Sequence, residues 1–157
     1  MKRVLLVLAL LVTGTLFGAP PAAAVELAAN GGFESGSLSP WTCTGNLGTI
    51  VTTPVHTGTR ALRGTTSGSD NARCQQVVAV QPNRTYTLKA WVNGSYVFLG
   101  VTGTGTTDTS TWTPSTGGSY AQLSVAFTTG ASTTSVTVYL NGWYGQPAYT
   151  ADDVSLT

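Results

Sequence analysis

Acidic side chains are scarce in this 157-residue chain, and two of the six, Glu34 and Asp152, lie near its opposite ends. Hydrolysis of a glycosidic bond normally requires two carboxylates placed across the scissile bond. Asp70 and Asp108 stand in Ser-, Gly- and Thr-rich loops, where solvated acids are the common case. We therefore predict no catalytic carboxylate pair, although a pair among these acids remains the alternative. A lone acid such as Glu34, just before the first expected strand, still requires an explanation.

The sequence also lacks the other motifs that are typical of enzyme active sites. His56 is the only histidine, and no G-x-S-x-G nucleophile elbow accompanies it. No Gly-rich phosphate loop, H-E-x-x-H motif or Cys/His cluster occurs either. We interpret His56 as a turn residue between Pro54 and Gly58. The sequence therefore predicts that the protein is not an enzyme.

Polar and aromatic residues on expected outward faces of strands indicate sugar binding. A sugar site needs flat aromatic faces for the pyranose ring and polar groups that orient its hydroxyls. Several exposed aromatics on one sheet face would form such a platform. The alternative for each candidate is that it is buried on the inner face of the second sheet, because alternation does not tell which sheet a strand joins. The candidates are Trp91, Tyr96, Phe98, Gln122, Tyr139, Asn141 and Lys89 on strands, with Trp143, Tyr144 and Trp112 in loops.

The first 24 residues are typical of a secretory signal peptide. Lys2 and Arg3 precede an apolar core at residues 4–12, and a small-residue cleavage site ends at Ala24. Residues 25–157 then form one secreted extracellular domain, with no further apolar run long enough for a membrane anchor. Charged residues make up 8% of the chain and form no basic stripe, so we expect neither nucleic acid nor a membrane as partner, and a monomer.

Cys43 and Cys74 are the only cysteines. In an exported chain, a single pair of cysteines most simply forms a disulfide. A metal site built on the two thiols would need more ligands than the one that His56 could add.

Alternation of apolar and polar residues predicts an all-β domain, since no segment after residue 24 has a helical period. The clearest strands are residues 86–92, 120–128 and 135–141, each with one apolar and one polar face. Asn93-Gly94 predicts a hairpin with residues 96–101 as the returning strand. We interpret residues 102–118 as a low-complexity loop. Weaker strands are expected at residues 48–52, 61–64, 75–80 and 149–156.

Five segments, in this order, resemble the cellulase C type of carbohydrate-binding module, families 4 and 9 and their relatives, most closely the modules of actinobacterial secreted chitinases and other glycoside hydrolases. The resemblance implies a jelly-roll β-sandwich of two antiparallel sheets, with a ligand cleft across the concave sheet or a site in the edge loops. The segments are residues 30–34 (NGGFE), Trp41, residues 85–92 (TYTLKAWV), Phe127-Thr128 and residues 151–156 (ADDVSL).

The resemblance also implies a structural calcium ion. The acid at Glu34 and one acid of the Asp152-Asp153 pair correspond to family ligands, with backbone carbonyls such as those of Gly32 and Arg60 completing the shell. Oxygen ligands of this kind are those that Ca²⁺ prefers. Asp152 shares the parity of the inward Val154, so we favour it as the inner ligand.

We therefore expect a secreted, non-catalytic module that binds chitin, cellulose, xylan or β-glucan. The family's aromatic platform is carried over at Trp91, Tyr96 and Tyr139. The chain shows no catalytic domain of its own, so an accessory or detached module of a glycoside hydrolase is one alternative. An extracellular adhesion or protein-interaction domain is the other.

Overall fold

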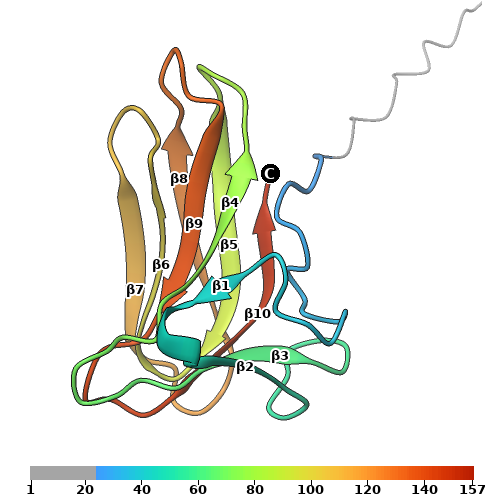
Figure 1. Ribbon diagram of the computed structural model, residues 1–157, viewed down its shortest axis with the longest axis vertical. Coiled ribbons are helices and arrows are strands. Elements are labelled where there is room, and N and C mark those ends of the chain that lie inside the picture. Colours follow the sequence, from blue (N-terminus) through green and yellow to red (C-terminus); the bar gives the residue numbers. More distant parts are fainter. Residues whose placement is uncertain (1–23) are drawn as a thin grey trace, which may run out of the picture.

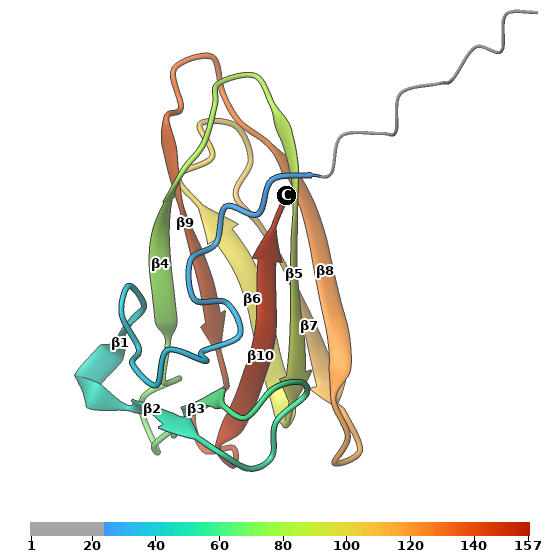
Figure 2. The same ribbon diagram turned by 90° about the vertical axis from the view of Figure 1, so that its right-hand side faces the viewer.

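The computed structural model describes residues 24–157, which form two antiparallel five-stranded sheets facing each other (Figure 1, Figure 2). The predicted all-β sandwich is confirmed. The strands are β1 (Thr42–Cys43), β2 (Gly48–Val51), β3 (Ala61–Gly64), β4 (Cys74–Ala79), β5 (Thr85–Asn93), β6 (Ser95–Thr102), β7 (Thr109–Ser115), β8 (Ala121–Thr128), β9 (Ser135–Asn141) and β10 (Tyr149–Leu156), with one short 3₁₀ helix, η1 (Thr44–Asn46).

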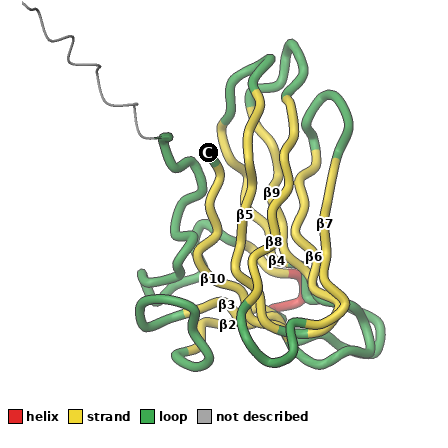
Figure 3. The backbone as a smooth tube through the Cα atoms, turned by 180° about the vertical axis from the view of Figure 1, so that it is seen from behind, coloured by secondary structure: helices red, strands yellow, loops and turns green. Residues whose placement is uncertain are grey.

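We call the two layers sheet A, with strand order β1-β4-β9-β6-β7, and sheet B, with order β2-β3-β10-β5-β8. The longer strands run along the long axis of the molecule, with loops at both ends (Figure 3). Residues 24–157 contain no helix that is long and apolar enough to cross a membrane. Apart from Ala24, the predicted signal peptide lies outside the described residues.

Alternation along each strand builds the core between the sheets. In β9, Val136, Val138 and Leu140 are buried while the residues between them face outward. In β5, Leu88, Ala90 and Val92 are likewise buried. Because successive side chains point to opposite faces, burying one parity commits the other parity to the outer surface. The predicted inward and outward assignments of these strands are confirmed.

Two expectations for the middle of the chain are wrong. Residues 102–118 are not one loop, because they contain β7, whose Thr-rich sequence lacks the apolar alternation that marks a strand. The turn at Asn93-Gly94 does not close a hairpin: β5 belongs to sheet B and β6 to sheet A, so the chain crosses between layers there. Gly94, with φ of 150°, makes this crossing beside Tyr149, where a Cβ would lie 3.0 Å from the Tyr149 Cβ.

The first described segment runs beside the last strand, β10 (Figure 1). The Leu27 N–H donates to the Leu156 carbonyl at 2.9 Å, and the Val154 N–H donates to the Gly31 carbonyl at 3.0 Å. Phe33 and Trp41 are buried against each other, with ring centroids 5.7 Å apart. The two ends of the domain are thus hydrogen-bonded together and share its core.

The expected disulfide is present between Cys43 of β1 and Cys74 of β4, which are paired across the two strands. It closes a loop with a sequence separation of 31 residues. The bond ties the short edge strand β1 to sheet A.

Replacing both cysteines (Cys43→Ser with Cys74→Ser) should lower the free energy of unfolding by about 3–4 kcal/mol, because the unfolded chain regains loop entropy. Urea denaturation of the oxidised wild type and of the variant measures the difference. Reductant should destabilise the wild type and leave the variant unchanged. Equal midpoints for the oxidised wild type and the variant would show that the bond adds no stability.

Candidate functional site

Six aromatic side chains gather on the outer surface of sheet A. Tyr96 and Phe98 point outward from β6, because Val97 and Leu99 are buried in the core. Trp112 lies directly opposite Phe98 on β7. We call this surface the aromatic face; its members are Tyr96, Phe98, Trp112, Tyr139, Trp143 and Tyr144.

Five of these rings form a continuous row, in which neighbouring rings are stacked or tilted against each other. Ring centroids lie 5.9 Å apart between Tyr96 and Trp112, and 5.6 Å apart between Trp112 and Phe98. The row continues from Phe98 to Trp143 at 5.7 Å and from Trp143 to Tyr144 at 5.1 Å. Trp112 and Tyr144 each expose 49% of their surface. Large apolar surfaces exposed together on a folded domain mark binding sites, and rings in a row can stack on successive sugar rings.

Tyr139 extends the aromatic face toward β4. Its ring lies across the backbone of Gly100, where a Cβ would be 2.4 Å from the ring, so only glycine permits this position. The Arg73 guanidinium lies over the ring, 3.8 Å from the centroid. Its Nε donates to Gln75 Oε1 at 3.0 Å, which fixes both side chains. The Tyr139 ring is thus held in place by its neighbours and bordered by polar side chains.

The polar groups on this surface can orient sugar hydroxyls. Asn141 stands opposite Phe98, and its Nδ2 donates to the Gly142 carbonyl at 2.6 Å. Gln75 lies opposite Tyr139. A cluster of exposed rings bordered by amide and guanidinium groups fits sugar stacking.

The sequence placed Trp91, Lys89 and Gln122 with this cluster, but the structure puts them on the outer surface of sheet B. Trp91 is paired with Gln122 of β8 and with Asp152 of β10. Its ring stacks on His56 at 4.0 Å between centroids and 14° between planes. Because it lies on sheet B, Trp91 is not part of the aromatic face, and His56 covers one face of its ring. The structure does bring together Tyr96, Phe98, Tyr139, Asn141, Trp143 and Tyr144.

Sequence reasoning missed Arg73 and Gln75 and treated Trp112 as a loop residue. Gln75 could have been found from its position, because it directly follows Cys74, which is buried in the core. Trp112 gave no such signal, since its strand has no apolar face.

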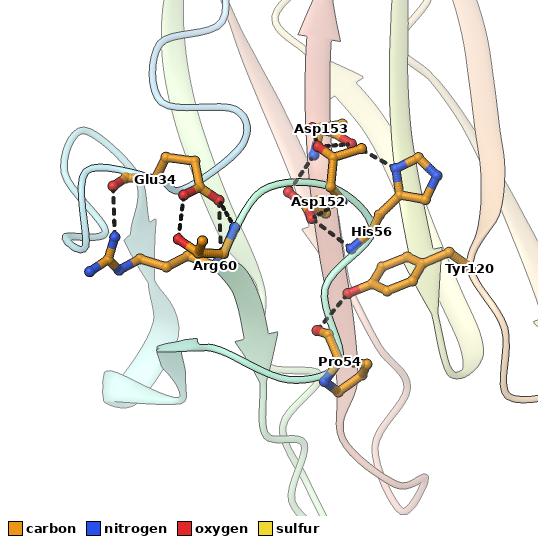
Figure 4. Close-up of polar contacts among 9 residues, drawn as sticks. Glu34, Pro54, His56, Arg60, Tyr120, Asp152 and Asp153 are labelled. Atoms are coloured by element: carbon orange, nitrogen blue, oxygen red, sulfur yellow. Dashed lines mark hydrogen bonds and ion pairs between the residues drawn. The ribbon is translucent and has the colours of Figure 1, made fainter.

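Glu34 holds the segment after β2 by hydrogen bonds (Figure 4). Its Oε1 accepts the N–H groups of Thr59 and Arg60, both at 2.8 Å, and its Oε2 accepts the Thr59 hydroxyl at 2.7 Å. The Arg60 guanidinium donates to the Glu34 carbonyl at 3.1 Å. The hydrogen bonds from Thr59, and then the Arg60 N–H, lower the pKa of Glu34 below its ordinary value. Glu34 is therefore an ionised anchor for this loop.

Asp152 and Asp153 hold the same loop from β10 (Figure 4). A bulge in the β10–β5 register, with Asp153 at φ of 46°, turns both acids toward residues 56–57. Asp152 Oδ2 accepts the N–H groups of His56 and Thr57 at 2.9 and 3.2 Å, and Asp153 Oδ2 lies 2.7 Å from His56 Nδ1. Burial raises the pKa of Asp152, and the hydrogen bonds from His56, Asp153 and Thr57 oppose that rise.

The donor set around this loop is hard oxygen, which suits a calcium ion. A Cβ on Gly32 would lie 3.6 Å from Asp153 Oδ1 and 3.9 Å from Glu34 Cγ, so residues from both chain ends meet there. Residues 24–157 contain no group of three or more His, Cys, Asp or Glu side chains able to hold a metal ion. Backbone carbonyls, such as those of Gly32 and Arg60, would therefore have to complete a calcium site with Glu34 and Asp152.

Comparison with known proteins gives a consistent result. A family model described as a carbohydrate binding domain matches residues 25–150. The chain is 57% identical over 155 residues to Exochitinase 1 of Streptomyces olivaceoviridis. The aligned region covers 98% of this chain and 25% of that protein. It is 38% identical over 119 residues to a keratan-sulfate endo-1,4-beta-galactosidase of Sphingobacterium multivorum, covering 73% of this chain and 27% of that protein. The chain thus spans about a quarter of the length of these relatives.

The fold also matches a solved structure, that of TmCBM61 in complex with β-1,4-galactotriose. The TM-score is 0.69 at 21% identity, with 85% of this chain and 99% of that chain covered. At this identity the likeness concerns the fold alone, and it agrees with the sandwich described above.

The carboxylate contacts to the loop predict a graded effect of substitution at Asp152. Asp152→Ala should lower the free energy of unfolding by about 2–3 kcal/mol, because the His56 and Thr57 N–H groups lose their acceptor. Asp152→Asn keeps one acceptor oxygen and should lose less. Chemical denaturation measures both, with Lys89→Ala, on the same outer surface, as a control that changes stability by less than about 0.5 kcal/mol. An alanine variant as stable as the wild type would refute the role of Asp152.

Proposed function

The chain belongs to the carbohydrate-binding domain family whose model spans residues 25–150, and on that premise we propose that it is a secreted, non-catalytic module that binds polysaccharide on the aromatic face. The observation that carries the proposal is the row of rings from Tyr96 to Tyr144, whose centroids lie 5.1–5.9 Å from those of their neighbours. Exposed rings of this kind reduce solubility without adding to the core, and a ligand that covers them removes that cost.

Chitin is the polysaccharide we propose, ahead of cellulose, xylan and β-glucan. Its support is the 57% identity to a protein named Exochitinase 1, which extends over almost the whole chain. Because the chain spans a quarter of that relative, the match concerns a part of it, and the hydrolytic activity in its name is not transferred here. A role as an accessory module for a chitin-degrading enzyme follows from the same likeness.

The positions of the acids support a non-catalytic role. Glu34 and Asp152 are each occupied by two backbone N–H groups of the loop after β2. Glu26 Oε1 accepts the N–H groups of Ala28 and Leu156. Asp70 and Asp108 each accept a backbone N–H within their own loops. These carboxylates serve the backbone, so we expect no release of reducing sugar from chitin.

Secretion is part of the proposal, because it rests on the signal-peptide pattern of residues 1–24. The alternative of an adhesion domain keeps the same fold and the same exposed rings. It would gain if a protein, and no polysaccharide, covered the aromatic face.

Binding to chitin suspensions, with wild type and single variants, tests the proposal. Trp112→Ala removes a central ring of the row and should raise the dissociation constant at least about tenfold. Trp91→Ala, the matched substitution on sheet B, should leave it within about twofold. Circular dichroism of each variant verifies the fold. Loss of binding in Trp91→Ala with retention in Trp112→Ala would overturn the assignment of the site to sheet A.

Calcium binding by Glu34, Asp152 and the carbonyls of Gly32 and Arg60 is a second part of the proposal. The ion would add a further bond between the chain ends and the loop after β2. A ligand that binds only the folded state stabilises it by mass action. Chelator should therefore lower the melting temperature of the wild type and have little effect on Glu34→Gln. A wild-type melting curve that does not respond to chelator or to added Ca²⁺ would remove the ion and leave the hydrogen bonds as the whole clamp.

A further inference from the structure

Tyr144 is the last ring of the row on the aromatic face, and a loop carries it. Tyr96, Phe98 and Trp112 lie on β6 and β7, where the pairing within sheet A fixes their backbones. Tyr144 lies in residues 142–148, between β9 and β10, which we call the ring loop. Because the ring loop lies outside both sheets, contacts with other parts of the chain must fix the position of Tyr144.

A second loop, residues 65–73 between β3 and β4, lies beside the ring loop and binds its backbone (Figure 1). We call it the support loop. The Gly142 N–H donates to the Asn71 carbonyl at 2.9 Å, and the Gly145 N–H donates to the Ser67 carbonyl at 2.7 Å. These two bonds use backbone groups on both sides, so they do not depend on which side chains the support loop carries.

Asn71 adds a contact from its side chain. Its Oδ1 accepts the Tyr144 N–H at 2.7 Å. Tyr144 is the second residue of a tight turn, in which the Gln146 N–H donates to the Trp143 carbonyl at 3.1 Å and Gly145 has φ of 72°. A turn of this kind bonds only the N–H of its fourth residue, so the Tyr144 N–H needs an acceptor outside the turn. The Asn71 amide oxygen is that acceptor.

The support loop is itself held, so Asn71 is a fixed acceptor. Ser67 Oγ accepts the Asp70 N–H at 3.0 Å, and Asp70 Oδ1 accepts the Ala72 N–H at 2.7 Å. The buried Tyr149 hydroxyl donates to the Ala72 carbonyl at 2.8 Å. Burial raises the pKa of Tyr149, so this hydroxyl stays protonated and remains a donor. The backbone on both sides of Asn71 is thereby anchored.

The exposure of the Tyr144 ring makes its position depend on this anchor. Tyr144 exposes 49% of its surface, and its ring meets the row at Trp143, with 5.1 Å between centroids. Packing against the domain therefore fixes the ring only in part. A ring that is mobile before binding must be ordered when a sugar stacks on it, and this ordering weakens the affinity.

We infer that Asn71 is a positioning residue of the proposed sugar site: by holding the Tyr144 N–H it orders the last ring of the row, so that a chitin chain finds the row at its full length. Asn71 acts through Tyr144, and no contact between Asn71 and the sugar is required. The inference rests on the proposed function.

Titration calorimetry with a soluble chitin hexamer, hexa-N-acetylchitohexaose, tests this role. Asn71→Ala removes the acceptor and should raise the dissociation constant about threefold to tenfold, because the sugar must then order the turn. Asn71→Asp keeps an oxygen at the same place and should stay within about twofold of the wild type. An alanine variant that binds like the wild type would overturn the inference, and so would an aspartate variant as weak as the alanine variant.

A double-mutant cycle with Tyr144→Ala separates positioning from a general loss of stability. When the Tyr144 ring is absent, there is no ring for Asn71 to order. Adding Asn71→Ala to Tyr144→Ala should therefore change the dissociation constant by less than about twofold. The same fold-loss in this background as in the wild type would show that Asn71 acts by another route and would contradict the inference.

Amide hydrogen exchange of the free protein tests the hydrogen bond without any ligand. The Tyr144 amide should exchange at least about tenfold faster in Asn71→Ala than in the wild type or Asn71→Asp, while the amides of β9 exchange as before. An unchanged Tyr144 amide would refute positioning by Asn71. Failure of the wild type to bind the hexamer would instead refute the proposed function, so the two failures can be told apart.

Discussion

The aromatic face depends on the way the two sheets bury each other. In sheet A, the inward residues of β6 and β9, such as Val97 and Val138, are wholly buried against sheet B. Strand geometry then commits the alternate residues to the outer surface. Each Å² of apolar surface removed from water stabilises the fold by about 25 cal/mol, and this gain decides which parity of each strand faces the core. The rings of Phe98 and Tyr139 are outward because their neighbours form the core.

Rigidity of the face comes from glycine and from the cross-strand register. Gly100 leaves room for the Tyr139 ring to lie close to the sheet, and the Arg73 guanidinium packs over the ring. Phe98 lies between Trp112 of β7 and Asn141 of β9 in register. A platform whose rings are fixed before binding loses little side-chain entropy when a sugar arrives, and this favours affinity.

Sheet B and the chain ends serve a different purpose. The bulge at Asp153 turns two acids toward one loop, while Glu34 holds the same loop from the other side. As a result, His56 is placed over one face of the Trp91 ring. The acids near the two chain ends therefore hold the loop after β2, and the proposed ligand site is formed by other residues, the rings of sheet A.

Alternation predicted an all-β domain and the inward parity of β5, β8 and β9. The single pair of cysteines predicted the disulfide, and the family resemblance implied the sandwich. The sequence could not predict which sheet each strand joins. Trp91 and Tyr139 both face outward, yet they lie on opposite sides of the molecule, since β5 belongs to sheet B and β9 to sheet A. Arg73 and Trp112 were hidden for related reasons: one precedes a strand, and the other lies on a strand without an apolar face. A site assembled from four strands depends on which strands are neighbours in a sheet, and alternation along each strand does not reveal this.

The central claim is that sugar covers sheet A and leaves sheet B free, and hydroxyl-radical footprinting of the protein bound to chitin tests it most directly. The account predicts that oxidation of Trp112, Trp143 and Tyr144 falls several-fold on binding, while His56 and Tyr120 on sheet B are oxidised as in the free protein. Protection of His56 and Tyr120, with Trp112 still oxidised at its free rate, would contradict it.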